Sequence, residues 1–303
     1  MDVVGNLFSV SLYEGLVYGF VAIGVYITFR VLAFPDLTVD GSFPLGGAVV
    51  AVLIVGGINP WLATLAALGA GMCAGLGTSL LNTKLRINAL LAGILMMVAL
   101  YSINLLIMSS KANIPLLREI TIFEQISQFL GIRTGVTLSI VSMVVLTSII
   151  LIVLNWFLRT EIGLALRATG DNAQMVRGLG ADTDKTTILG VSISNGLVAL
   201  SGALVAQNQG VTDVGMGIGM IVMGLASVII GEGLFRPRGI TTILFAVVGG
   251  TFAYRLFLSV ALRLGLAPAN LKLITAALVI VALAIPFIRK KLRHEWVPPA
   301  VRM

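Results

Sequence analysis

The stretch Pro35-Asp36-Leu37-Thr38-Val39-Asp40-Gly41-Ser42 separates two apolar segments of unequal length. The segment before it, Leu7–Phe29, is long enough to cross a bilayer, which takes about 20 residues, whereas the segment after it, Pro44–Val55, is too short. Two carboxylates beside a half-length apolar helix are costly in hydrocarbon unless protein or water surrounds them. The stretch therefore predicts either a helix that is broken inside a membrane domain or an ordinary turn in which Asp36 caps a helix.

The composition of the whole chain is that of an integral membrane protein. Of its 303 residues, 58% are hydrophobic and 11% are charged, against about 25% charged in an average soluble domain. The mean hydropathy is +1.05. So little polar surface cannot solvate a globular domain of this size, which excludes a soluble enzyme, a disordered chain and a conventional nucleic-acid binder.

The chain contains seven full-length apolar segments and two short ones, which predicts an all-α, polytopic membrane protein with eight to ten transmembrane helices in a single domain, residues 1–303. The second short segment, Met216–Ile230, follows the polar, Gly-rich stretch Gly210–Gly215, and it enters from the opposite side to Pro44–Val55. Two interrupted segments of opposite orientation are what an inverted repeat leaves in a sequence. The full-length segments are Leu7–Phe29, Pro60–Leu81, Asn88–Met108, Val136–Phe157, Thr186–Ala206, Ile240–Leu262 and Leu271–Ile288.

The basic residues predict the orientation of the chain. With the carboxyl terminus inside, the connections 30–43, 83–87, 158–185, 232–238 and 289–303 hold 14 Lys and Arg, and the opposite connections hold 5. Short cytoplasmic loops carry such an excess of positive charge. We therefore expect the net charge of +7 to reflect topology, with 289–303 as a basic cytoplasmic tail. Arg255 is left inside a span, and we expect it to snorkel to the outer interface.

The external loop, residues 109–135, contains Thr121-Ile122-Phe123-Glu124, which has the pattern of a capping box that opens a helix. The apolar residues of this short helix would share one face. That face either rests on the lipid interface or serves as a docking surface for an external partner. Its residues are Ile122, Phe123, Ile126, Phe129 and Leu130.

The connection 158–185 is too long for a simple turn and has internal structure. We expect Arg159–Thr169 to continue helically and Gly170 to break the helix. A new short helix, capped by the stretch Asp171–Gln174, then runs through Leu179 and ends at Gly180. One face of this new helix either inserts into a groove of a cytoplasmic partner or lies on the inner leaflet as an amphipathic surface. This face consists of Asn172, Met175, Val176 and Leu179.

Several chemistries lack the residues that they require. His294, the single histidine, lies in the basic tail, so a histidine-based metal site and a Ser-His-Asp triad are excluded. Cys73 is the single cysteine, so no intramolecular disulfide can form. Residues 180–186 resemble a phosphate loop only superficially, because Asp184 stands where the loop needs glycine. Paired intramembrane acids and bases are also scarce. We therefore predict a chain that is not an enzyme and that binds no metal or cofactor itself.

Polar amides and glycines within the spans predict helix contacts. Most buried amides bond another helix, and one of the four here is expected to contact a substrate. A glycine-rich face on the span Pro60–Leu81 predicts close helix packing. The amides are Asn104, Asn195, Gln207 and Asn208, and the glycines are Gly69, Gly71, Gly75 and Gly77.

The order of these features resembles the membrane permease subunit of bacterial ATP-binding-cassette (ABC) importers of the branched-chain amino acid and ribose type. Residues 34–42 resemble the family's Gly-Ile-Asp-Leu-Ser-Val-Gly-Ser signature, residues 161–185 its cytoplasmic coupling segment, and residues 218–233 the stretch after its late broken helix. Pro35 and Asp40 depart from the sugar-type signature. The sequence resembles permeases for tryptophan and other amino-acid-like substrates.

The resemblance implies a permease in the bacterial inner membrane that dimerises or pairs with a paralogue, imports a small solute from an external solute-binding protein, and is driven by separate ATPase subunits that hold ATP and Mg²⁺. A self-contained carrier or channel is the alternative. The residues expected to line or gate the translocation pathway are Asp36, Leu37, Thr38, Asp40, Ser42, Asn195 and Asn208. Those expected to couple to the ATPase are Arg167, Asp171, Asn172, Met175, Leu179 and Gly180.

Overall fold

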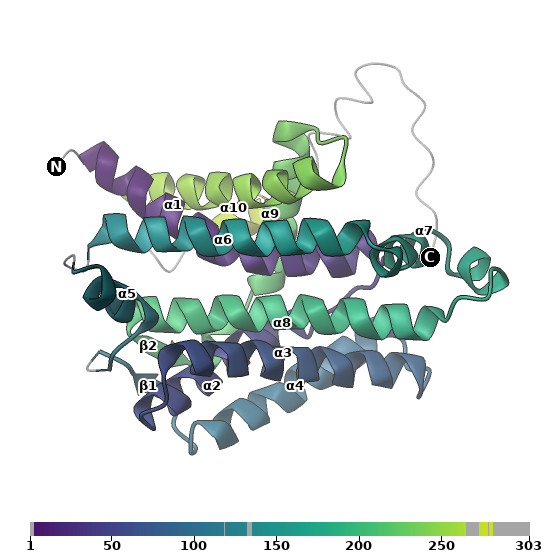
Figure 1. The fold of residues 1–303 in the computed structure, drawn as a ribbon, viewed down its shortest axis with the longest axis horizontal. Coiled ribbons are helices and arrows are strands. Elements are labelled where there is room, and N and C mark those ends of the chain that lie inside the picture. The colour runs from purple at the N-terminus through teal and green to yellow at the C-terminus, as the bar shows by residue number, and fades with distance from the viewer. Residues whose placement is uncertain (1–2, 118, 132–134, 265–272, 278, 281–303) are drawn as a thin grey trace.

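Long helices run side by side in the computed structural model, which describes residues 3–117, 119–131, 135–264, 273–277, 279 and 280 (Figure 1). In this part of the chain seven helical segments are long and apolar enough to cross a membrane, and α2 is a shorter apolar helix. Six of the seven are predicted full-length spans. The seventh, Val214–Phe235, was predicted from Met216–Ile230 as too short, but the 3₁₀ turn before it extends it to 22 residues. The expected last span, Leu271–Ile288, lies largely outside the described residues. The elements are α1 (Val3–Val25), the π-helix η1 (Tyr26–Val31), α2 (Val39–Val55), α3 (Pro60–Thr83), α4 (Ala89–Ile107), β1 (Asn113–Pro115), α5 (Ile122–Leu130), α6 (Val136–Arg159), α7 (Glu161–Gly178), α8 (Thr183–Gln209), β2 (Val211–Asp213), the 3₁₀ helix η2 (Val214–Gly217), α9 (Met220–Phe235) and α10 (Ile240–Arg263).

The buried helix α8 is the centre of the bundle, and α2 and α3 pack most closely on it. The predicted glycine face of α3 explains this in part. A Cβ at Gly71 or Gly75 would collide with the α8 backbone, and one at Gly77 would meet the Met96 side chain of α4, whereas Gly69 has nothing within 4 Å. Three of the four glycines therefore allow the close packing that the sequence predicts.

The charged connections lie at one end of the bundle, which we call the basic end. The connections η1–α2, α3–α4, α6–α7–α8 and α9–α10 meet there, whereas β1, β2, α5 and the start of α1 lie at the opposite end, called the ribbon end (Figure 1). Arg30 forms a salt bridge with Glu232 across the basic end. This arrangement matches the charge count, while the tail 289–303 lies outside the described residues.

The ribbon end is held by a two-stranded antiparallel ribbon that the sequence analysis did not predict. β1 pairs with β2 so that Ile114 faces Thr212, which joins the segment after α4 to the segment after α8. The predicted capping box at α5 is confirmed, because Thr121 accepts from the backbone N–H of Glu124 and the Glu124 carboxylate accepts from the Thr121 N–H.

The predicted course of residues 158–180 is wrong in two places. The span α6 ends at Arg159, because Thr160 adopts an extended conformation and caps the new helix α7 through the Gly163 N–H. The break inside α7 falls at Asn172 (φ −157°, ψ 89°), not at Gly170. Asn172 breaks the helix because its side-chain oxygen accepts from the Met175 N–H at 3.0 Å, which starts a second helical turn.

Candidate functional site

The signature stretch folds back into the bundle from the basic end. α1 widens into the π-helix η1, and Ala33 then takes a positive φ of 51° as the chain reverses. The reversal carries Asp36 to Asn195, which lies midway along α8. The segment therefore enters the membrane domain and is not an ordinary surface turn.

A fully buried network of hydrogen bonds lies at this depth, and we call it the Asp36 network. Its members are Asp36, Thr38, Ser42, Thr78 and Asn195. The Asp36 carboxylate accepts from the Thr38 backbone N–H at 2.9 Å and from the Asn195 amide at 2.6 Å. The Ser42 hydroxyl donates to the other side of the Asn195 amide at 2.7 Å, and the Thr38 and Thr78 hydroxyls are 2.7 Å apart. All five residues have zero exposed area. Buried polar groups satisfied in this way fix one arrangement of the backbone.

Asp40, in the first turn of α2, caps the start of α9. Its carboxylate oxygens accept from the backbone N–H groups of Gly219 at 3.1 Å and Ile221 at 2.9 Å. A carboxylate at a helix N-terminus satisfies free N–H groups and complements the helix dipole. The N-termini of the two broken helices therefore meet inside the bundle, and α2 runs from there to the ribbon end while α9 runs to the basic end (Figure 1).

The helix α2 begins five residues earlier than predicted, so Pro44 lies inside it. Proline has no N–H, which leaves the Asp40 carbonyl without its usual helical partner. The backbone of Gly217 packs against this carbonyl so closely that a Cβ there would collide with it. The free carbonyl that Pro44 leaves in α2 and the glycine before α9 therefore fit against each other.

The predicted pathway residues are partly brought together. Asp36, Thr38, Ser42 and Asn195 bond one another with no exposed area, so in this conformation they position α2 rather than present a surface. The remaining members differ from them: Leu37 and Asp40 are half-buried, and Asn208 is exposed at the end of α8, away from the others. Whether the seven residues line or gate a pathway stays a prediction.

Two other amides bond neighbouring elements, as expected. Asn104 donates to the Gly41 carbonyl at 3.2 Å. Gln207 donates to the Thr64 hydroxyl at 2.8 Å and accepts from the Ile122 backbone N–H at 3.1 Å. These contacts hold α4 against α2 and α5 against α8.

The second half of α7 presents an apolar turn at the basic end. Met175 is 56% exposed and Leu179 is 77% exposed, but Val176, which was expected on the same face, is 3% exposed and packs inward. Gly180 ends the turn with a φ of +84°. The exposed face is therefore narrower than predicted, and the other expected coupling residues, Asp171 and Asn172, are exposed beside it.

The first half of α7 contacts the chain just before the Asp36 network. A Cβ at Gly170 would collide with the carbonyl of Val31, the last residue of η1. Arg167, a predicted coupling residue, is half-buried, and its Nε has no hydrogen-bond partner in the described structure. Contact therefore runs from the first half of α7 to the end of η1, which leads into the loop that holds Asp36.

The comparisons with known proteins agree with this architecture. Residues 7–284 match the family described as branched-chain amino acid transport system, permease component. A tyrosine transport system permease protein of Clostridioides difficile is 43% identical over 271 residues, 89% of this chain and 88% of that one. An uncharacterized protein of Rickettsia prowazekii is 35% identical over 283 residues, 92% of this chain and 97% of that one. The chain belongs to this permease family.

A solved structure shares the fold. PsaBC from Streptococcus pneumoniae, in complex with an Fab, matches with a TM-score of 0.52 and 15% identity over 90% of this chain and 89% of that one. The chain is a multi-pass permease of the ABC importer class, and its resemblance to that class is confirmed.

The permease also contains a charged contact that the sequence analysis missed. Arg255 in α10 does not extend to the outer interface, because it pairs with Glu14 of α1 at 3.5 Å and lies over the Tyr18 ring. An acidic residue inside a span requires a partner, so the presence of Glu14 was the available signal. This pair of an intramembrane acid and an intramembrane base was not predicted from the sequence, although one pair agrees with the expectation that such pairs are scarce.

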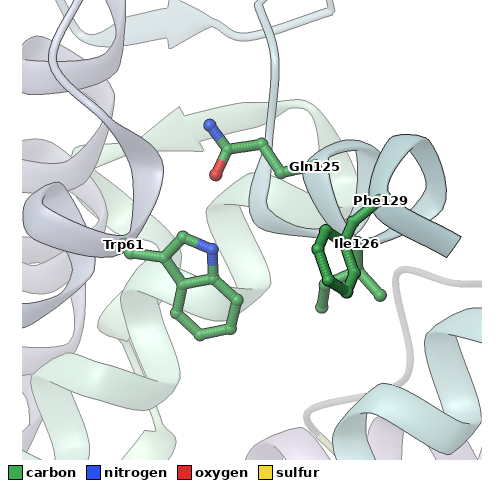
Figure 2. A pocket seen from close by; sticks show the side chains of 4 residues that line it. All are labelled: Trp61, Gln125, Ile126 and Phe129. Atoms are coloured by element: carbon green, nitrogen blue, oxygen red, sulfur yellow. The ribbon is translucent and has the colours of Figure 1, made fainter.

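A cleft opens at the ribbon end of the permease beside α5. It has a volume of about 410 Å³ and is lined by Trp61, Gln125, Ile126 and Phe129, as Figure 2 shows. Phe129 is 90% exposed, whereas Ile122 and Phe123 at the start of α5 are buried. The predicted apolar face is thus divided, with one part packed on the bundle and the other free for lipid or a partner.

Proposed function

We propose that this permease forms the membrane pathway for an amino acid or related small solute, delivered by an external solute-binding protein at the ribbon end and driven by ATPase subunits at the basic end. The family match supports the importer class, and the relative named for tyrosine transport supports the substrate class. The ATP and Mg²⁺ belong to the ATPase subunits. The basic end is then cytoplasmic and the membrane is the bacterial inner membrane.

The observation that carries this proposal is the exposed apolar turn of α7. Met175 and Leu179 are exposed side by side at the basic end, where an amphipathic turn can insert into a groove of a partner. The first half of the same helix, before the break at Asn172, contacts the end of η1 through Gly170 and Val31, which links α7 to the interior of the bundle. Movement imposed on α7 by an ATPase would be transmitted through η1 to the Asp36 loop.

The meeting point of the broken helices is the proposed gate. Asp36 fixes α2 to α8, and Asp40 fixes α9 to α2, so a displacement of η1 moves both half-helices together. Leu37, Thr38 and Ser42 then come to line the pathway as α2 shifts. The full pathway requires a second permease chain, either a second copy or a paralogue.

The test uses the permease assembled with its ATPase subunits in lipid vesicles. Met175→Asp with Leu179→Asp places two charges on the exposed turn and should abolish ATP hydrolysis stimulated by the loaded binding protein, while insertion and folding are unchanged. Leu85→Asp is the matched control, because Leu85 is 65% exposed in the α3–α4 turn at the same end. Unchanged stimulation in the double variant would refute the coupling assignment, and uptake without any ATPase would favour a self-contained carrier or channel.

A further inference from the structure

An acidic residue of one span and a basic residue of another lie next to each other in the outer half of the bundle. Arg255 Nη1 of α10 lies 3.5 Å from Glu14 Oε2 of α1, and the guanidinium lies 3.6 Å from the centre of the Tyr18 ring. Tyr18 in turn stacks on Phe43 of α2, with ring centres 5.9 Å apart. We call Glu14, Tyr18 and Arg255 the charged cluster.

The charged cluster lies within the membrane-spanning part of the helices. Glu14 is seven residues from the start of its span at Leu7, which is about 10 Å along a helix. Arg255 is eight residues from the end of its span at Arg263, about 12 Å. Charges at such depth face the bundle interior or a water-filled cavity, because contact with hydrocarbon is expensive.

The cluster is nevertheless accessible, unlike the Asp36 network. The side chains of Glu14 and Arg255 are 34% and 17% exposed, whereas every member of the Asp36 network has no exposed area. Because lipid contact would be expensive, the exposed part of these two side chains is expected to face water or the second permease chain that completes the pathway.

The cluster also has unused hydrogen-bonding capacity. The ion pair, at 3.5 Å, is longer than a charge-assisted hydrogen bond of about 2.8 Å. Arg255 Nε and the hydroxyl of the neighbouring Tyr13 are buried, and neither has a hydrogen-bond partner in the described part of the chain. A guanidinium has five donors in a fork that fits a carboxylate, and here most of them are not used.

We propose that Glu14, Tyr18 and Arg255 bind the zwitterionic head group of an α-amino acid in the outer half of the pathway. The guanidinium accepts the ligand carboxylate in its fork, and the Glu14 carboxylate pairs with the ligand ammonium. Tyr18 holds the guanidinium in place through its ring face. The inference rests on the proposed function and adds to it a site of substrate recognition within the permease itself.

The test is direct binding of L-tyrosine to the permease–ATPase complex in phospholipid nanodiscs, with no solute-binding protein present. Tyramine keeps the ammonium alone and 3-(4-hydroxyphenyl)propionate keeps the carboxylate alone, so each competes through one charge. The wild-type complex should bind L-tyrosine about 10-fold more tightly than either analogue, as expected for one charged hydrogen-bonding contact. Glu14→Gln should remove the preference over the propionate, and Arg255→Gln should remove the preference over tyramine.

Controls separate a binding role from a packing role. Lys111→Gln, at an exposed position of the ribbon end, should leave all three affinities unchanged, and Arg255→Lys should keep the order of the probes. A lower melting temperature with an unchanged order of probes would show a structural ion pair and overturn the inference. Absence of saturable binding to a wild-type complex that still transports would also overturn it and leave the proposed function intact, whereas loss of ATP-driven uptake in the wild type would refute the function itself.

Discussion

Asn195→Asp is the sharpest test of the Asp36 network. The substitution keeps the size of the side chain but replaces an amide that donates to Asp36 at 2.6 Å with a second carboxylate. Two acceptors would then face each other with no exposed area. The exchanged pair, Asp36→Asn with Asn195→Asp, restores the pattern, because the amide introduced at position 36 can accept from the Thr38 N–H and donate to the carboxylate introduced at position 195.

The size of the effect follows from the burial of the pair. Breaking a buried charge-assisted pair costs about 3 to 5 kcal/mol. For a chain of 303 residues, an unfolding entropy of about 2.1 cal/mol/K per residue converts this into a fall in the melting temperature of about 5 to 8 °C. The exchanged pair should recover most of this loss.

Thermal melting of the purified permease in detergent measures both variants. Asn208→Asp is the matched control, because Asn208 is exposed at the end of the same helix, and it should leave the melting temperature within about 1 °C of the wild type. If Asn195→Asp has the same melting temperature as the wild type, the network does not fix α2 as described. The same follows if the exchanged pair melts no higher than Asn195→Asp alone.

Asp40→Ala should lower the stability by about 1 to 2 kcal/mol, because the N-terminus of α9 loses its capping carboxylate, and melting in detergent measures the loss. Gly170→Ala should reduce ATPase stimulation by displacing α7 from the end of η1, whereas Gly69→Ala on α3, where a Cβ meets nothing within 4 Å, should not. The backbone N–H of Lys185 holds the pKa of the Asp182 carboxyl below its usual value. The cap therefore stabilises the start of α8 above the usual pKa and is lost as the pH falls through the lowered one, so Asp182→Asn should flatten the pH dependence of amide exchange there.

The sequence predicted elements that depend on local chemistry. The capping box at Thr121 and the full-length spans follow from neighbouring residues and from length, and the structure confirms them in the described part of the chain. The start of α2 differs from the prediction because proline is most common at the first position of a helix, whereas Pro44 lies five residues inside α2. The carbonyl that this proline leaves without a helical partner lies against Gly217, a contact between positions far apart in the chain that the sequence alone does not reveal.

The pairings within the network and the charged cluster could not be predicted, and three members, Thr78, Glu14 and Tyr18, were not predicted at all. Asp36 and Asn195 were each singled out, but their pairing joins positions 159 residues apart. Glu14 and Arg255 are 241 residues apart, and their pairing depends on how α1 packs against α10. A span tolerates one charge only with a partner, but a single sequence does not say which charge that partner is.

The meeting of two helix N-termini inside the bundle has a consequence for ion leakage. Helix N-termini carry partial positive charge. Without a partner in the middle of a membrane, they would form a binding site for chloride or another small anion. In this permease a carboxylate of the chain accepts from the free N–H groups at the start of α9, and another accepts just before the start of α2. These carboxylates neutralise the partial positive charge where the half-helices meet. A small anion therefore finds no favourable binding site there while the solute is absent.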